Sequence, residues 1–126
     1  MSKNIPRIII IDENHINRGM VALCLHSIGC EIIGYAVDGE EGIDLFKKKK
    51  PEVVLINENI CGNDFSDITG QILSASPDTM ILLLNNDENT FSDNELCEFG
   101  IRGSVYKKNF MSMGDELKSY IKSHSI

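Results

Sequence analysis

The sequence predicts an α/β domain in which five parallel strands alternate with five helices. Short, continuous apolar runs recur along the chain, and such runs are typical of strands that are covered on both faces, as in a parallel sheet. Segments with helical periodicity separate these runs. Because βα crossovers are right-handed, this alternation places helices on both faces of the sheet.

The predicted strands lie at apolar runs of different lengths. They cover residues 8–11, 32–33, 53–56 and 80–84, and a weaker run covers residues 104–106. The first run is made only of isoleucine and ends abruptly at Asp12. Since β-branched side chains pack well on a pleated surface, we expect a sheet core built from aliphatic residues.

The predicted helices are marked by spacing and by capping residues. In the first helix, Ile16, Met20, Leu23 and Ser27 share one face, and Gly29 is placed to end it. A second helix opens at the capping-box pattern of residues 38–41 and closes with the lysines of residues 47–50.

The remaining helices follow the same logic. The third ends near Pro77, the fourth opens at Ser92 with Glu95 three residues on, and the fifth opens at Ser112 with Asp115 three residues on. The side chains expected to face inward from the second to the fifth helix are Ile43, Phe46, Ile68, Ile72, Leu96, Phe99, Met113, Leu117 and Ile121.

Composition limits the classes of function. The chain has 126 residues and a net charge of −7, so we expect one soluble domain over residues 1–126 that repels nucleic acid and anionic membranes. The N-terminus shows no signal peptide pattern, which predicts a cytoplasmic protein. The cysteines lack a metal-binding spacing, and we expect Cys24, Cys30 and Cys97 to be buried, reduced thiols.

Polar residues follow most of the predicted strands. They are Asp12 and Glu13, then Asn57, then Asn85 to Asp87, then Lys107. In an open parallel sheet, ligands bind outside the carboxyl ends of the strands, so these residues outline a shallow cleft. Acidic and carbonyl oxygens there would suit Mg²⁺. The alternative is that strand ends are loops, which are polar without having any function.

A further set of motifs runs in one register along nearly the whole chain. It comprises residues 8–14, Asn17 with Arg18, residues 36–43, residues 51–57, Gly62, Asp64, residues 100–103 and Lys107. Together these motifs resemble the receiver domain of two-component response regulators, of the chemotaxis-regulator type. The Asn14 to Arg18 segment is most similar to receivers attached to hybrid histidine kinases. The resemblance implies a flavodoxin-like, doubly wound sheet of order 2-1-3-4-5.

The resemblance also implies a role for each position of the site. In the family, an Asp aligned with Asn57 receives a phosphoryl group from a kinase histidine. Mg²⁺ is held by that Asp, by the acid aligned with Glu13 and by the backbone carbonyl aligned with Asn59. A lysine aligned with Lys107 pairs with the phosphoryl oxygens. Two further positions transmit the effect of phosphorylation. A Ser or Thr after the fourth strand moves to hydrogen-bond the phosphoryl group, and an aromatic residue on the fifth strand swings inward.

This sequence departs from the family at the acceptor and at both transmitting positions. The acceptor position is Asn57, whose amide is a poor nucleophile and cannot form an acyl phosphate. The hydroxyl position is Asn85, and the aromatic position is Ser104, with Tyr106 two residues on and on the same strand face. The usual Lys-Pro pair is Lys107 followed by Lys108. These departures indicate a degenerate pseudo-receiver.

We therefore expect a non-enzymatic signalling module that acts by protein–protein interaction. One alternative is an ordinary receiver in which an Asp at position 57 has been mutated to Asn. A second is a small flavodoxin-like enzyme or ligand-binding domain, although no Gly-rich loop or catalytic triad supports it. Asp12, Glu13 and Lys107 are expected to form a structural ion pair or triad, with weak Mg²⁺ binding at most and no other cofactor.

Two surfaces are candidates for the contact with a partner. One is the first helix around His15, Asn17 and Arg18, where receivers meet a kinase or phosphotransfer domain. The other is the face of the fourth helix, fifth strand and fifth helix. Its candidate anchors are Phe91, Tyr106, Lys108 and Tyr120. Since aromatic residues are favoured interface anchors, the sequence favours the second surface, with a kinase, a phosphotransfer or output domain, or a second copy as partner.

Overall fold

The structure is a computed structural model that describes residues 5–60, 65–86, 91–108 and 110–124. The motif residues Gly62 and Asp64, and the strand-end residue Asp87, lie outside the described residues. None of the described helices is both long enough and apolar enough to cross a membrane.

The sheet has five parallel strands in the order β2-β1-β3-β4-β5, as predicted. The strands are β1 (Arg7–Ile11), β2 (Glu31–Ala36), β3 (Val53–Asn57), β4 (Met80–Asn85) and β5 (Gly103–Tyr106). The register between β1 and β2 shifts at Ile8 and Ile9. β2 is longer than the two residues predicted because, as an edge strand, it is only partly covered, with Ala36 as its one buried residue, and it does not form a continuous apolar run.

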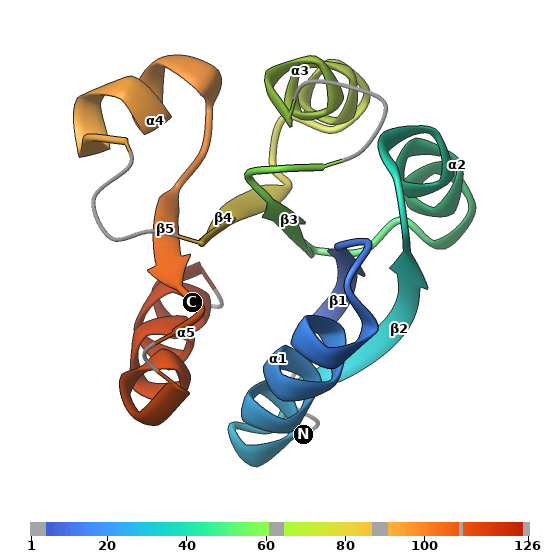
Figure 1. Ribbon diagram of the computed structural model, residues 1–126. Helices are drawn as coiled ribbons and strands as arrows, with labels where there is room; N and C mark the ends of the chain where they lie inside the picture. The colour runs from blue at the N-terminus through green and yellow to red at the C-terminus, as the bar shows by residue number, and fades with distance from the viewer. Residues whose placement is uncertain (1–4, 61–64, 87–90, 109, 125–126) are drawn as a thin grey trace.

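Helices cover both faces of this sheet (Figure 1). On one face lie α1 (His15–Ser27) and α5 (Phe110–His124), and on the other lie α2 (Gly39–Lys49), α3 (Phe65–Ala75) and α4 (Asp93–Phe99). The isoleucines of β1 alternate between the two cores, with Ile8 and Ile10 on the α1 and α5 side and Ile9 and Ile11 on the other. This is why an unbroken apolar run was needed for β1.

The helix starts are fixed by side-chain caps. The Asn14 side chain accepts hydrogen bonds from the backbone N–H groups of Ile16 and Asn17, and Asp38 accepts one from Glu41. Ser92 opens α4 with a complete capping box, as predicted. The fifth helix starts at Phe110, two residues before the predicted Ser112.

The predicted face of α1 is not the one that packs on the sheet. Ile16 and Leu23 are 62% and 63% exposed, and the buried residues of the helix are Val21, Ala22, Cys24 and Leu25. The helix carries apolar residues on two sides, so its periodicity alone does not identify the buried one.

Two further predictions of burial, both in the short helix α4, are wrong. Leu96 is its one buried residue, while Cys97 is exposed and Phe99 is 38% exposed. Residues one and three positions beyond Leu96 point about 100° and 60° away from it around a helix, so a helix of this length buries only a narrow stripe. Cys24 and Cys30 are buried as expected, and burial raises the pKa of both thiols.

Candidate functional site at the carboxyl ends of the strands

Four polar side chains are buried together at the carboxyl ends of four neighbouring strands. Asp12 follows β1, Asn57 and Asn85 end β3 and β4, and Lys107 follows β5. Their exposed fractions are 0%, 5%, 3% and 6%. Because burial of polar groups costs free energy unless they are paired, such a cluster needs internal partners. Asp12, Asn57, Asn85 and Lys107 of the predicted strand-end residues thus lie together at the carboxyl ends of the strands.

An ion pair joins the two ends of the site. Lys107 Nζ lies 3.3 Å from Asp12 Oδ2, so the side chain that follows β5 reaches the carboxylate that follows β1. The other carboxylate oxygen, Asp12 Oδ1, accepts a hydrogen bond of 3.0 Å from the backbone N–H of Asn14. Arg18 Nη1 donates to the backbone carbonyl of Asp12 at 2.7 Å. The predicted ion pair of Asp12 with Lys107 is present.

Asn57 occupies the centre of this edge as a neutral acceptor. Its Oδ1 accepts a hydrogen bond of 2.9 Å from the backbone N–H of Asn59 and a longer one of 3.4 Å from Asn86 Nδ2. The second contact comes from the loop after β4, so two amide side chains link the ends of β3 and β4. A side chain held this way is oriented by hydrogen bonds and carries no charge.

Asn85 contributes a buried oxygen to the same region. Within the described residues, Asn85 Oδ1 has no hydrogen-bond partner. The backbone of Asn85 is paired, because its carbonyl oxygen accepts a hydrogen bond of 3.1 Å from the backbone N–H of Lys107. The Asn85 amide therefore fills the position that the resemblance gives to a small hydroxyl, and its oxygen is buried there without a hydrogen-bond partner among the described residues.

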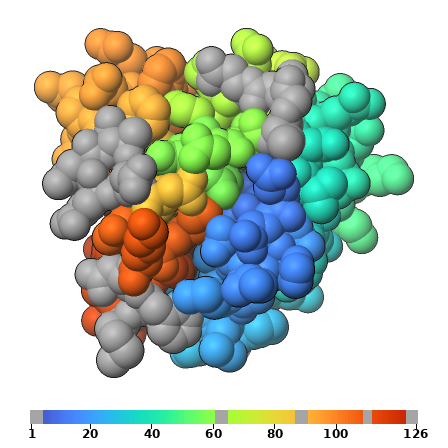
Figure 2. Space-filling view, viewed as in Figure 1, coloured from blue at the N-terminus to red at the C-terminus, as the bar shows by residue number. Residues whose placement is uncertain are grey.

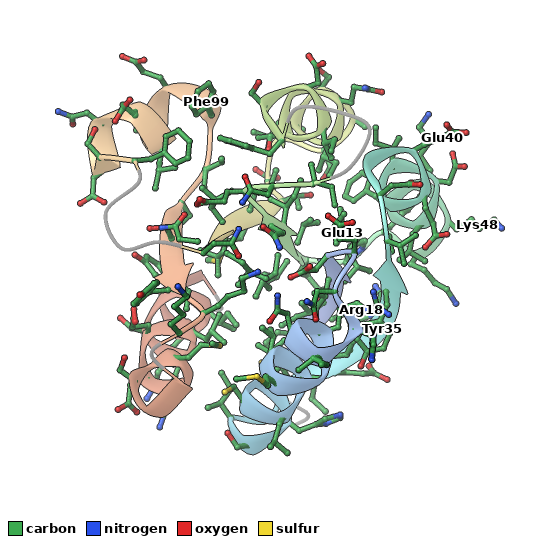
Figure 3. The ribbon with its side chains drawn as sticks, in the orientation of Figure 1. Glu13, Arg18, Tyr35, Glu40, Lys48 and Phe99 are labelled. Atoms are coloured by element: carbon green, nitrogen blue, oxygen red, sulfur yellow. The ribbon has the colours of Figure 1, made fainter. Side chains whose placement is uncertain are left out.

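The donor set fits Mg²⁺ poorly. The described residues contain no group of three or more His, Cys, Asp or Glu side chains that could hold a metal ion. Asp12 already directs one oxygen to an ammonium and the other to a backbone N–H, and Asn57 replaces a carboxylate by an amide. Glu13 is exposed beside them at the end of β1 (Figure 3). A cation here would compete with Lys107 for Asp12.

Ser104, at the aromatic transmitting position, lies on β5 and is half-buried on the same strand face as Tyr106, as period two requires. Lys108 and His15 are exposed.

Two of the proposed aromatic anchors are engaged inside the domain. The ring of Phe91 packs edge-on against that of Phe65, with 5.3 Å between centroids. The ring of Tyr120 lies directly over Gly103, where any Cβ would meet it. Burial raises the pKa of the Tyr120 hydroxyl, and the carboxylates of Asp93 and Glu116 raise it further.

Sequence reasoning missed an aromatic residue beside α1. Tyr35 of β2 is 47% exposed, and the guanidinium of Arg18 lies over its ring at 6.0 Å from the centroid (Figure 3). An exposed aromatic on an edge strand was a usable signal, but its pairing with Arg18 depends on how α1 crosses β2. The hydrogen bond from Asn86 to Asn57 was missed for the same reason, since the two residues are far apart in sequence.

The comparison with known families decides what kind of domain this is. The response regulator receiver domain family matches residues 8–121. The chain belongs to this family. The receiver domain is a part of two-component signal transduction, and the predicted fold and family are both confirmed.

Individual proteins agree with this assignment. A protein-glutamate methylesterase/protein-glutamine glutaminase of Geobacter sulfurreducens is 31% identical over 83 residues, which cover 65% of this chain and 22% of that protein. Response regulator GacA of Pseudomonas viridiflava is 26% identical over 102 residues, covering 80% of this chain and 48% of that protein. The response regulator domain of Thermotoga maritima CheB has the same fold, with a TM-score of 0.84 at 18% identity and 97% of each chain covered.

These curated relatives are longer proteins. The chain spans between 22% and 51% of their length. What the receiver domain shares with them is therefore the signalling module and not the activity of their other parts.

Proposed function

We propose that this receiver domain does not accept a phosphoryl group and acts through protein contacts instead. The observation that carries the proposal is the amide of Asn57, which stands at the end of β3 where the family has its acceptor carboxylate. An amide oxygen is uncharged and a poor nucleophile, so no acyl phosphate can form on it. Asn85 and Ser104 also lack the hydroxyl and the aromatic ring of the transmitting positions.

The ion pair supports the same proposal. In the family, the lysine aligned with Lys107 pairs with phosphoryl oxygens, whereas here its ammonium has a carboxylate partner inside the site. Asp12 is thereby neutralised without a metal ion, and we propose that the domain binds Mg²⁺ weakly at most. On this proposal the domain is not an enzyme, and its place is the cytoplasm, where two-component receivers meet their partners.

Both candidate contact surfaces remain part of the proposal, but the exposure of their side chains now favours the first surface over the second. On the second surface, the rings of Phe91 and Tyr120 pack partly against residues of the same domain, which leaves less of them for a partner. On the first surface, Ile16 and Leu23 are more exposed than any other large apolar side chain in the described residues, and Tyr35 adds an exposed aromatic ring. We therefore favour α1 and its surroundings as the contact surface.

Phosphoryl uptake tests the proposal directly. The protein is incubated with acetyl phosphate and Mg²⁺, and its intact mass is recorded beside that of an ordinary receiver that serves as a positive control for the reagent. We expect no mass change. A gain of one phosphoryl group, mapped to Asp12, Glu13 or any other residue of the site, would contradict the proposal.

The variant Asn57→Asp separates the proposal from the alternative of a mutated acceptor. If the remaining site were that of an ordinary receiver, this variant would take up phosphate and its amide signals on α4, β5 and α5 would shift with beryllofluoride. We expect no such shift on that surface, because Asn85 and Ser104 remain in the transmitting positions. No observation favours the second alternative, a flavodoxin-like enzyme or ligand-binding domain.

A further inference from the structure

The exposed side of α1 carries an apolar stripe. Ile16 and Leu23 are 62% and 63% exposed, and the half-buried Met20 lies between them on the same side of the helix. Figure 2 shows α1 in blue on the surface turned toward the viewer, with no other described element laid over it. Two large aliphatic side chains one above the other on a free helix face are a pattern of helix–helix contacts.

Gly19 lies within this stripe and has no role inside the domain. A Cβ built at this position would meet nothing within 4 Å, and the residue is exposed within an ordinary helical stretch. Glycine weakens a helix because it has more conformational freedom to lose on folding. Gly70 of α3 and Gly114 of α5 have the same open space, so Gly19 does not by itself indicate a partner. It leaves room in the stripe for the close approach of another side chain.

The stripe is complementary to itself. Gly19 and Met20 lie at its middle, with Ile16 on one side and Leu23 on the other. A two-fold axis through the middle would place Ile16 against Leu23 of the second copy, and Met20 in the notch left by Gly19 of the second copy. Isologous contacts need such a pattern, in which residue i meets j and j meets i. The two helices would then be antiparallel, so that their dipoles attract.

Charge opposes a second copy less at α1 than at the other helices. The chain carries a net charge of −7, so two copies repel each other in general. α1 contains no Asp or Glu, whereas α2, α3, α4 and α5 each contain at least one. The side chains of α1 therefore add no carboxylate repulsion to the contact.

We propose that two copies of this chain associate through α1, as an antiparallel helix pair centred on Gly19 and Met20. The inference rests on the proposed function, because it names the partner for those protein contacts. A helix of 13 residues offers less than the roughly 800 Å² per partner that stable complexes bury, so the dimer is expected to be weak. Weak pairing suits a contact made only where the protein is concentrated or tethered.

Sedimentation velocity over a range of concentrations tests the proposal. We expect the wild-type chain to shift from monomer to dimer in the micromolar to millimolar range, and Leu23→Gln to remain monomeric. The control is Phe99→Gln, which removes a 38% exposed apolar side chain from α4 on the other face of the sheet. Its ring also packs edge-on against Phe65, so this variant loses some internal packing, but it should dimerise like the wild type. Circular dichroism confirms that each variant is folded.

Gly19→Ala separates a contact role from a role in helix stability. The added methyl group lies in open space within one chain, so the monomer should become more stable to heat, while the filled notch should weaken the dimer several-fold. A wild-type chain that stays monomeric throughout would overturn the proposal, as would a dimer that survives Leu23→Gln but fails with Phe99→Gln. So would a monomer that binds a different protein through Leu23. Phosphoryl uptake is read separately from intact mass, so failure of the proposed function and failure of the dimer proposal are distinguishable.

Discussion

Replacing Lys107 by Met should destabilise the fold much more than an ordinary surface change. The substitution keeps an unbranched apolar stem but removes the ammonium 3.3 Å from Asp12 Oδ2, and Asp12 is 0% exposed. Removing one partner of a buried ion pair costs about 3–5 kcal/mol, because the remaining charge is left uncompensated. Asp12 keeps the backbone N–H of Asn14, which places the expected cost near the lower end of that range.

The reciprocal variants test the same reasoning from the other side. Asp12→Asn keeps an acceptor for Asn14, and the long stem of Lys107 can turn its ammonium toward water, so we expect a loss of about 1–2 kcal/mol. The double variant of Asp12→Asn with Lys107→Met contains no buried charge at the site. It should be about as stable as Asp12→Asn alone, and its loss should be smaller than the sum of the two single losses.

Urea unfolding at neutral pH, followed by circular dichroism, measures these differences. A loss of about 3 kcal/mol corresponds to a fall of roughly 10 °C in Tm for a domain of this size, so thermal unfolding provides a second measurement. The matched control is Lys108→Met, which changes the exposed neighbouring lysine and should leave the midpoint unchanged. If Lys107→Met unfolds at the same urea concentration as Lys108→Met, the ion pair does not stabilise the fold and the reasoning is refuted.

Three further predictions concern stability. Gly19→Ala should raise the free energy of unfolding by about 0.5–1 kcal/mol, whereas Gly100→Ala should lower it, because Gly100 has a φ of +81° that alanine adopts only with strain. Both changes are measured by urea unfolding. Ser92→Ala removes the capping box shared with Glu95 and should cost about 1 kcal/mol, with the loss of amide protection confined to α4. Burial raises the pKa of Tyr120 in the folded state, so its contribution to stability is complete below the unfolded value of about 10 and is lost as the pH rises through the folded value. Tyr120→Phe should therefore flatten the alkaline decline of stability, and a decline as steep as that of the wild type would contradict this.

The fold was predictable because its signals are local. Each of the central strands is a continuous apolar run, and the caps at Asp38 and Ser92 stand in the sequence next to the helices that they open. The buried side of α1 was not predictable in this way. Its two apolar stripes have the same helical spacing, and only the packing of Val21 and Leu25 against the sheet distinguishes them.

The site was likewise predictable in part. Which residues gather at the strand ends follows from the topology, since parallel strands end at one edge. Their pairing does not, because Lys107 and Asp12 are 95 residues apart and Asn86 and Asn57 are 29 apart. Such bonds depend on the length and direction of side chains that meet only in the folded sheet, and no local sequence pattern predicts them.

The substitutions at the site form one consistent change in its electrostatics. A receiver that accepts a phosphoryl group must tolerate close carboxylates when no ligand is bound, and a bound metal ion would relieve this repulsion. With Asn57 in place of a carboxylate, one acid fewer faces Asp12, and Lys107 alone balances that residue. Asn86, just after β4, then donates one long hydrogen bond from Nδ2 to Asn57 Oδ1 at the end of β3. On the proposed function, the strand ends are thus stabilised without any ligand, which leaves surface contacts as the means by which the domain can carry a signal.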